Sequence, residues 1–341
     1  MNIHEVAKAA GVSIATVSRV VNHPESVSEK TREKVLAIMN SGGSTKKDYR
    51  DKIATKQSRN IAVVLPSQSN YPDTYEGILG VAEGKNYHVF LCVAGESKDG
   101  LLHCVQAMVE QSIDGMILAT EGDYLPAVYL LQKANFPFVC IGSKPVSECC
   151  NSCYINYRES AAKMAQYLAE LNCRSVHVVS SPQVSDCREA LEEGFLAAWK
   201  GSGRSTEQLR LESIETSFRG GEQYARLMLQ NKAQIPDAVL CQSDETAAGI
   251  IKAAGEMGLS LPADLRVVGF CDSAISAAIT PELTTVEQPT RRLGMAAARR
   301  LFDIIGESEY FDIESQEIAL KGRLKIRRSC GNDKAIYEIY E

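Results

Sequence analysis

From residue 60 onward, short apolar runs alternate with stretches of helical periodicity. The runs are continuous enough in β-branched and other apolar residues for strands that are buried on both faces of a parallel sheet. They cover residues 61–66, 88–94, 115–120, 138–143, 175–181, 238–244 and 265–271. Because parallel strands need crossover connections, the alternation predicts doubly wound α/β sheets.

Ligands of such sheets bind beyond the carboxyl ends of the strands. The polar residues that follow the predicted strands are therefore candidate ligand contacts, and they lie at 67–70, 180–188, 243–244 and 272–273. No phosphate-binding glycine pattern follows these strands, and none of the five histidines stands in a motif with a nucleophile or metal ligands. The sequence predicts no enzyme, no cofactor and no metal.

The first 22 residues predict two short helices joined at Gly11. Ser13 is suited to cap the second helix, whose valines gather on one side. The opposite side carries Ile14, Ala15, Ser18, Arg19 and Asn22. A third helix at 28–39 would close a small core. This pattern predicts a helix-turn-helix, although an amphipathic hairpin within a larger helical domain has the same stripe.

The charge of the chain is divided unevenly. Residues 1–60 contain 11 Lys and Arg against 6 Asp and Glu, a net charge of +5, whereas the remaining residues have a net charge of −11. A basic head on an acidic body suits a protein that places one end on phosphates. With 341 residues and 45% hydrophobic content, the chain is long enough for a head and a two-lobed body.

The predicted compartment and the distribution of cysteines both indicate a protein with reduced thiols. The chain has no apolar run of about 18 residues and no amino-terminal export signal, so we expect a cytoplasmic protein without a membrane contact. Its 11 cysteines form an odd number and are scattered through predicted strands, as in a reduced protein. Cys149, Cys150 and Cys153 form a cluster that could bind a soft metal or sense oxidation. Without a second ligand pair nearby, a cysteine-tolerant loop is the favoured interpretation.

Several motifs occur together in a characteristic order. They are VAKAAGVSIATVSRVVN at 6–22, VSEKTREKV at 27–35, IDGMI at 113–117, SDETAAG at 243–249, VVGF at 267–270 and TPELTTVEQP at 280–289. With these motifs the chain resembles the LacI/GalR family of bacterial transcription regulators over about residues 2–330. The small apolar pair Ile14 and Ala15 resembles the catabolite-control branch of that family.

The resemblance implies a homodimer that binds a pseudopalindromic DNA operator, with a helix-turn-helix head and a periplasmic-binding-protein-like core. The implied division is a head at 1–43, a hinge at 44–59, a core at 60–331 and a tail at 332–341. Within the core it implies an N-lobe at 60–157 and 290–319 and a C-lobe at 158–288 and 320–331, with crossovers near Arg158, Gln288 and Leu320. A small-molecule effector, most typically a sugar or sugar phosphate, or a protein corepressor would control a repressor of this kind.

The family's base-contacting positions correspond to Ile14, Ala15 and Arg19. An arginine can donate two hydrogen bonds to guanine O6 and N7, whereas the apolar pair offers contact to a thymine methyl group. Backbone contacts would come from Ser13, Thr16, Ser18 and Asn22. In the hinge, most family residues are replaced. Ile53 could insert into the minor groove of a DNA-ordered helix, and a solvated basic linker is an equal alternative.

The effector site also departs from the family, which often has arginine, asparagine and aspartate where this chain has Leu191, Ser243 and Cys271. The candidate effector contacts are Ser185, Arg188, Phe218, Ser243, Asp244 and Asp272. Alternatively, Asp244 caps a helix that begins at Glu245, and Phe218 belongs to the core.

A solute-binding module without DNA function is the alternative for the body of the chain. It would account for residues 60–330, but it would have no use for Arg19 on a helix-turn-helix, and it would carry an export signal.

Overall fold

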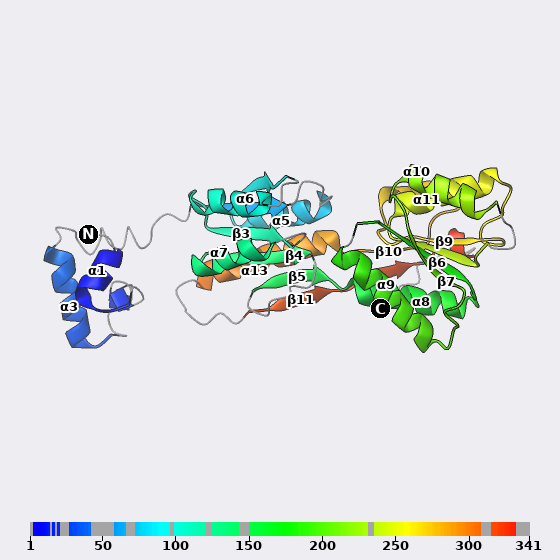
Figure 1. The fold of residues 1–341 in the computed structure, drawn as a ribbon. Coiled ribbons are helices and arrows are strands. Elements are labelled where there is room, and N and C mark those ends of the chain that lie inside the picture. Colours follow the sequence, from blue (N-terminus) through cyan, green and yellow to red (C-terminus); the bar gives the residue numbers. More distant parts are fainter. Residues whose placement is uncertain are drawn as a thin grey trace.

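The computed structural model describes residues 3–13, 16–17, 19–20, 27–41, 58–65, 72–95, 99–120, 124–142, 150–183, 185–230, 235–307 and 315–331. These residues form a small helical head and an α/β core with two parallel sheets and a two-stranded antiparallel ribbon (Figure 1). Within these ranges no helix has the length and apolar character needed to cross a membrane. The expected tail and all but the last two residues of the expected hinge lie outside them.

The head packs its helices around a core of valines and alanines. Helices α1 (Ile3–Ala10) and α3 (Glu29–Ser41) flank a helical segment that includes residues 16–17 and 19–20. Gly11 has a φ of 65°, the left-handed conformation that ends α1 and starts the turn. The buried side chains are Val6, Ala7, Ala10, Val17, Val20 and Val35. The predicted helix-turn-helix and its third helix are confirmed.

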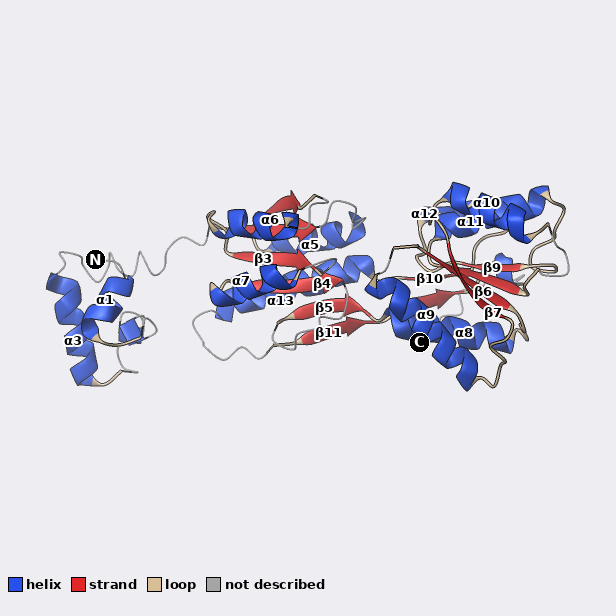
Figure 2. Cartoon of the chain, viewed as in Figure 1, coloured by secondary structure: helices blue, strands red, loops and turns tan. Residues whose placement is uncertain are grey.

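The N-lobe, as we name the part built on the first sheet, has six strands in the order β11-β5-β4-β3-β1-β2, all paired in parallel. These strands are β1 (Asn60–Leu65), β2 (His88–Val93), β3 (Gly115–Ala119), β4 (Phe138–Gly142), β5 (Ser152–Ile155) and β11 (Glu317–Leu320). Helices α5 (Pro72–Gly84) and α13 (Thr290–Glu307) pack on one face. Helices α6 (Gly100–Val109) and α7 (Leu125–Lys133) pack on the other face (Figure 2).

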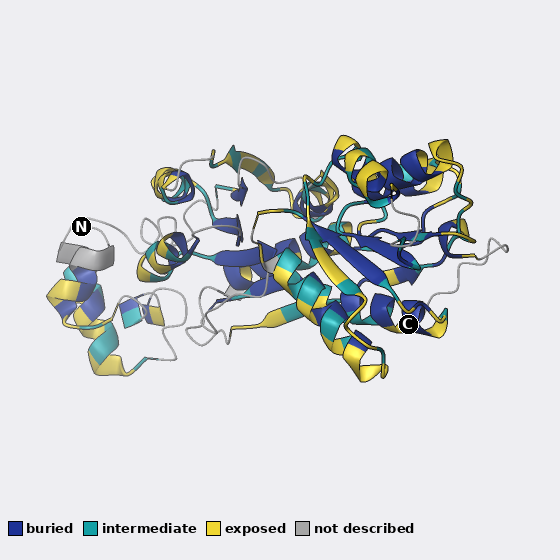
Figure 3. Ribbon diagram, turned by 45° about the vertical axis from the view of Figure 1, so that its right-hand side comes forward, coloured by how far each residue is buried: buried dark blue, intermediate teal, exposed yellow. Residues whose placement is uncertain are grey.

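The C-lobe, built on the second sheet, has four parallel strands in the order β7-β6-β8-β9. They are β6 (Val176–Ser180), β7 (Leu209–Ser213), β8 (Ala238–Cys241) and β9 (Arg266–Val268). Helices α8 (Tyr157–Glu170) and α9 (Asp186–Gly201) cover one face. Helices α10 (Phe218–Met228) and α11 (Asp244–Glu256) cover the other, and the short helix α12 (Ala274–Ala278) follows β9. Figure 3 shows buried strands inside the sheets, and exposed residues on the outer helix faces and on edge strands such as β7.

The chain passes between the two sheets after β5, after β10 (Thr285–Glu287) and after β11. Strand β10 pairs antiparallel with β12 (Arg323–Lys325), which precedes the 3-10 helix η3 (Arg328–Cys330). Gly322 lies where these segments meet, since a Cβ atom there would stand 2.6 Å from Ser160 Oγ and 2.7 Å from Val286 Cγ1. The glycine lets the three passages pack against one another.

In both lobes, paired helices approach closely through glycines. A Cβ atom on Gly294 of α13 would lie 1.9 Å from the carbonyl oxygen of Thr74 in α5, and one on Gly77 would lie 2.2 Å from that of Arg291. In the C-lobe, Gly249 of α11 has the same relation to the carbonyl oxygen of Phe218, at 2.0 Å. Side chains at these positions would force the helices apart.

All seven predicted strands are present, but the structure shortens several of them. The predicted strand 238–244 ends at Cys241, because Ser243 caps α11 and Asp244 is already in its first turn. The alternative that Asp244 caps a helix beginning at Glu245 is wrong, since Ser243 Oγ accepts the hydrogen bond from Thr246 N. The strands that were not predicted, β5, β7, β10, β11 and β12, have three to five residues each.

His177 of β6 is buried beneath α10, where its Nδ1 shares a 2.7 Å hydrogen bond with the Tyr224 hydroxyl. Burial, with a smaller contribution from Arg210, lowers the pKa of His177 from 6.5 to about 4. The unfolded chain therefore binds more protons than the folded one between these values. The contribution of His177 to the free energy of unfolding is fully present above pH 6.5. It falls by roughly 1–3 kcal/mol as the pH drops toward 4.

Urea unfolding at pH 7.5 and pH 5 measures this loss. We expect the loss to be much smaller in His177→Asn, which cannot titrate there, and unchanged in His103→Asn, which alters an exposed histidine. An equal pH dependence in His177→Asn and the parent protein would show that another group is responsible.

Candidate DNA-recognition helix and effector site

Three of the predicted DNA contacts lie within the described residues: Ser13, Thr16 and Arg19. Ser13 Oγ accepts a 3.1 Å hydrogen bond from Thr16 N and thereby caps the helix. Val17 and Val20 are fully buried in the head core, whereas Arg19 between them is exposed. Its guanidinium is thus available to a duplex. The predicted contacts Ile14, Ala15, Ser18, Asn22 and Ile53 lie outside the described residues.

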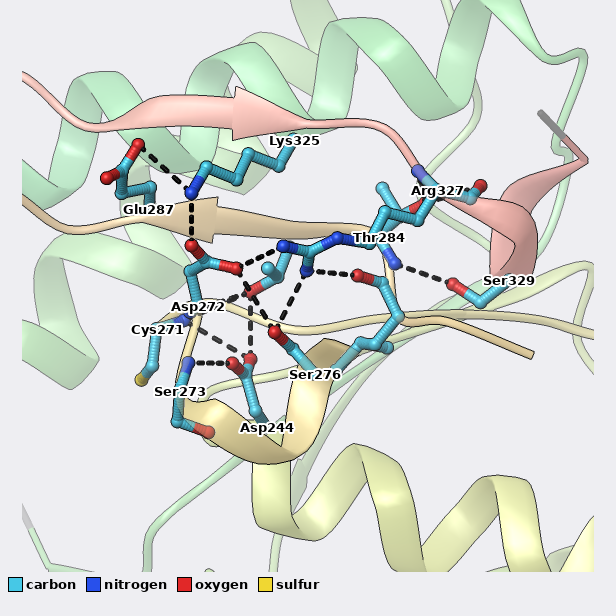
Figure 4. Close-up of polar contacts among 12 residues, drawn as sticks. Asp244, Cys271, Asp272, Ser273, Ser276, Thr284, Glu287, Lys325, Arg327 and Ser329 are labelled. Atoms are coloured by element: carbon cyan, nitrogen blue, oxygen red, sulfur yellow. Dashed lines mark hydrogen bonds and ion pairs between the residues drawn. The ribbon is translucent and has the colours of Figure 1, made fainter. Parts of the chain in front are cut away.

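Asp244 holds together the carboxyl end of the second sheet (Figure 4). Its side chain is fully buried and accepts four hydrogen bonds. The donors are Phe270 N at 3.0 Å, Cys271 N at 3.3 Å, Ser273 N at 2.7 Å and Thr285 Oγ1 at 2.8 Å. Burial raises the pKa of Asp244, and these donors oppose the increase. Three of the four donors are backbone nitrogens in the loop that follows β9, so the carboxylate positions that loop.

Asp272 points away from Asp244, toward β12 (Figure 4). Its carboxylate is 2.5 Å from Lys325 Nζ and 2.7 Å from an Arg327 terminal nitrogen, and it accepts a hydrogen bond from Ser276 Oγ. Burial favours a higher pKa for Asp272, but the two cations hold the pKa below its usual value. The Asp272 backbone N and Asp244 share Thr285 Oγ1, so the two predicted carboxylates belong to one network.

Ser185 and Arg188 lie at the start of α9, beside the end of β6. Ser185 Oγ accepts from Arg188 N and caps the helix. The Arg188 guanidinium donates to Glu192 Oε1 at 2.8 Å and to the carbonyl oxygen of Ser181 at 2.9 Å. Ser180 Oγ donates to the same Glu192 oxygen. Arg188 therefore fixes the β6–α9 turn.

Ser243 caps α11 and donates to Glu245 Oε2 at 2.7 Å. Phe218, the first residue of α10, is partly buried, and the Lys252 ammonium lies 5.6 Å from the centre of its ring. Its backbone oxygen packs against Gly249. The described contacts of Phe218 are thus with α11, while the other five predicted residues surround the strand ends.

Gln242 connects these strand ends and was missed because it fell inside the predicted strand 238–244. Its Oε1 accepts a 2.8 Å hydrogen bond from Ser181 N, and its Nε2 lies 3.9 Å from Cys187 Sγ. The Cys271 thiol donates to the Gln242 carbonyl oxygen at 3.4 Å. Gln242 thus joins β6, β8 and the loop after β9. Leu191, where family members often have arginine, is fully buried in the core.

The predicted cysteine cluster is partly described. Cys150 and Cys153 are buried in the N-lobe, and Cys149 lies outside the described residues. Across the described ranges, no group of three or more His, Cys, Asp or Glu residues is arranged to hold a metal ion.

Comparison with known proteins finds family matches for both the head and the core of the chain. Residues 2–43 match bacterial regulatory proteins of the lacI family, and residues 165–330 match the periplasmic binding protein-like domain. Catabolite control protein A of Priestia megaterium is 28% identical over 96% of this chain and 99% of its own length.

Solved structures give the same result. A LacI family transcriptional regulator from Enterococcus faecium with bound ribose is 26% identical, with a TM-score of 0.68 over 79% of this chain and 98% of that one. The lac repressor bound to ONPG is 25% identical, with a TM-score of 0.70 over 96% of this chain and 99% of that one. The head match argues against a solute-binding module without DNA function. The chain belongs to the lacI family of bacterial regulatory proteins, which are DNA-binding transcription regulators and not enzymes.

Proposed function

We propose that this regulator is a cytoplasmic repressor that binds a pseudopalindromic operator as a homodimer. The observation that carries the proposal is the exposed Arg19, set between the buried Val17 and Val20 on a head with a net charge of +5. This geometry fits a recognition helix in the major groove. Base contacts are assigned to Ile14, Ala15 and Arg19. Backbone contacts are assigned to Ser13, Thr16, Ser18 and Asn22, and a minor-groove contact to Ile53.

Arg19→Ala tests the DNA contact. We expect specific operator binding to weaken by about 1–3 kcal/mol and discrimination at one base pair to relax, because a bidentate contact to guanine is lost. Fluorescence anisotropy with an operator selected from genomic fragments measures both effects at a fixed salt concentration. Lys30→Ala, an exposed cation on α3, serves as the charge control and should retain base discrimination. Unchanged preference in Arg19→Ala would remove this residue from the recognition set.

The homodimer is supported by the edge of the first sheet. Strand β2 pairs only with β1 among the described strands, and its Phe90, Leu91 and Val93 are 51%, 48% and 55% exposed. An apolar sheet edge of this kind is a natural contact for a second copy of the chain. The two heads of such a homodimer would bind two operator half-sites. We also propose the division into head, hinge, N-lobe, C-lobe and tail with the boundaries given above.

We assign the effector site to the carboxyl ends of the C-lobe strands, around Ser185, Arg188, Ser243, Asp244 and Asp272, with Phe218 as a further candidate. The relative solved with ribose supports a sugar as the effector class, and we propose a sugar phosphate as the related candidate. In this chain the six side chains already have internal partners, so Gln242 and the neighbouring thiols become additional candidates for ligand contact. A protein corepressor is the alternative effector.

A thermal-shift screen of sugars, sugar phosphates and nucleosides tests this assignment. A ligand at 100 times its dissociation constant should stabilise the protein by about 2.7 kcal/mol. Gln242→Ala should weaken the response to a ligand found in the screen, whereas Glu207→Ala, at an exposed turn, should not. A screen without any response would favour the protein corepressor.

A further inference from the structure

A pair of thiols lies between the edge strand of the N-lobe and the helix that follows it. Cys92 is in β2 and Cys104 is in α6. The Cys104 sulfur is 3.9 Å from the carbonyl oxygen of Val93, the residue that follows Cys92, and both thiols pack against the same apolar cluster on this face of the sheet. Both residues are only half-buried. The two thiols are therefore neighbours on one face of the sheet, and both lie near solvent.

A second thiol pair in the same lobe is buried. Cys140 and Cys150 share a side-chain hydrogen bond, and they are 0% and 3% exposed. Other described thiols in the interior are Cys153, Cys173, Cys241 and Cys330. Because oxidation of a cysteine depends on access as well as on the sulfur, the buried pair is an internal control for the half-buried one.

We propose that Cys92 and Cys104 form an oxidative modification site, at which hydrogen peroxide or a small organic hydroperoxide closes a disulfide between β2 and α6. The proposal does not depend on the proposed operator or effector. It concerns the reduced cytoplasmic form of the chain, in which thiols are the resting state and disulfides form in response to oxidants.

The order of the two steps follows from the surroundings of Cys92. Burial and then the contact with Cys104 raise the pKa of Cys92 to about 12, so Cys92 keeps its proton and Cys104 is the sulfur that attacks. The Cys104 sulfur bonds to one peroxide oxygen, the O–O bond breaks, and the departing oxygen leaves as water after taking the Cys104 proton. Cys104 becomes a sulfenic acid.

Cys92 completes the reaction. Its sulfur attacks the Cys104 sulfur, the S–O bond breaks, and the hydroxyl group leaves as a second water with the Cys92 proton. One peroxide is reduced to two waters, and two thiols are oxidised to one disulfide. The new bond ties the exposed apolar edge of the sheet to α6.

The sequence makes the test direct. Trypsin cleaves after Lys85, Lys98 and Lys133, so Cys92 and Cys104 fall in peptides 86–98 and 99–133, each with a single cysteine. The full-length reduced protein is treated with hydrogen peroxide at neutral pH, blocked with N-ethylmaleimide and digested. We expect mass spectrometry to show the two peptides linked, two hydrogens lighter than their sum, and separated again by dithiothreitol. At the same dose Cys140 and Cys150 should stay reduced.

Variants separate the proposal from general oxidation. Cys92→Ser should lose the linked peptide and accumulate sulfinic acid at Cys104, because the sulfenic acid then has no thiol to capture it. Cys187→Ser removes a half-buried thiol elsewhere and should leave the linkage unchanged. Circular dichroism confirms that each variant is folded. The proposal is overturned if folded protein gives no linked peptide while other thiols oxidise, or if the linkage forms only in denaturant.

Discussion

Replacing Asp244 with alanine is expected to lower the free energy of unfolding by about 4 kcal/mol, because buried donors lose their acceptor and each unsatisfied donor costs about 1–3 kcal/mol. The donors come from three backbone nitrogens of 270–273 and from Thr285 Oγ1. Water entering the space would satisfy some of them, which keeps the loss below the full sum. Urea unfolding followed by circular dichroism measures the change.

Two further variants give this result its meaning. Asp244→Asn keeps the size of the side chain but turns one acceptor into a donor that faces other donors, so we expect about half of the loss. Glu245→Ala changes the exposed neighbour and should stay within about 0.5 kcal/mol of the parent. If Asp244→Ala were as stable as Glu245→Ala, the carboxylate would not be what orders the loop after β9.

Gly294→Ala is expected to destabilise the N-lobe by about 3 kcal/mol or more, since overpacking of a rigid contact costs at least about 1–3 kcal/mol. The added methyl would lie 1.9 Å from the carbonyl oxygen of Thr74, and backbone cannot turn aside as a flexible side chain can. Helices α5 and α13 would have to separate. Thermal unfolding with circular dichroism detection gives the change, with loss of ellipticity at a lower temperature.

The chain supplies a matched control in the same helix pair. A Cβ atom at Gly80 of α5 meets nothing within 4 Å, so Gly80→Ala should stabilise the protein by about 0.5–1 kcal/mol through helix propensity alone. Opposite signs for the two alanines would establish that close packing, and not backbone entropy, requires Gly294. Equal effects of the two variants would contradict this account.

The long periodic features of this fold were predictable from the sequence, and the short ones were not. The mostly apolar runs of β1, β3 and β6 are buried on both faces, so their composition alone identifies them. Strands β10 and β12 have three residues each, and β7 and β11 lie at sheet edges with mostly polar or alternating side chains. Their pairing depends on distant segments, which no local pattern contains.

The candidate effector site shows the same division. Position after a strand correctly placed Ser185, Arg188 and Asp272 at the carboxyl ends of the C-lobe strands. The partners of Asp272 could not be predicted, because Lys325 is 53 residues away along the chain. Gln242 was overlooked because strand and helix signals overlap between 238 and 244, and only the Ser243 cap shows where one ends and the other begins.

The polar ties between the loop after β9 and the crossing strands have a mechanical consequence. Asp272 is bound to Lys325 and Arg327 of the last passage, and Gln288 Nε2 of the middle passage donates to the carbonyl oxygen of Phe270 at 2.9 Å. Two of the three interlobe connections are thereby tied to the loop after β9, which belongs to the proposed effector site. A rotation of one lobe against the other would therefore also displace the loop after β9.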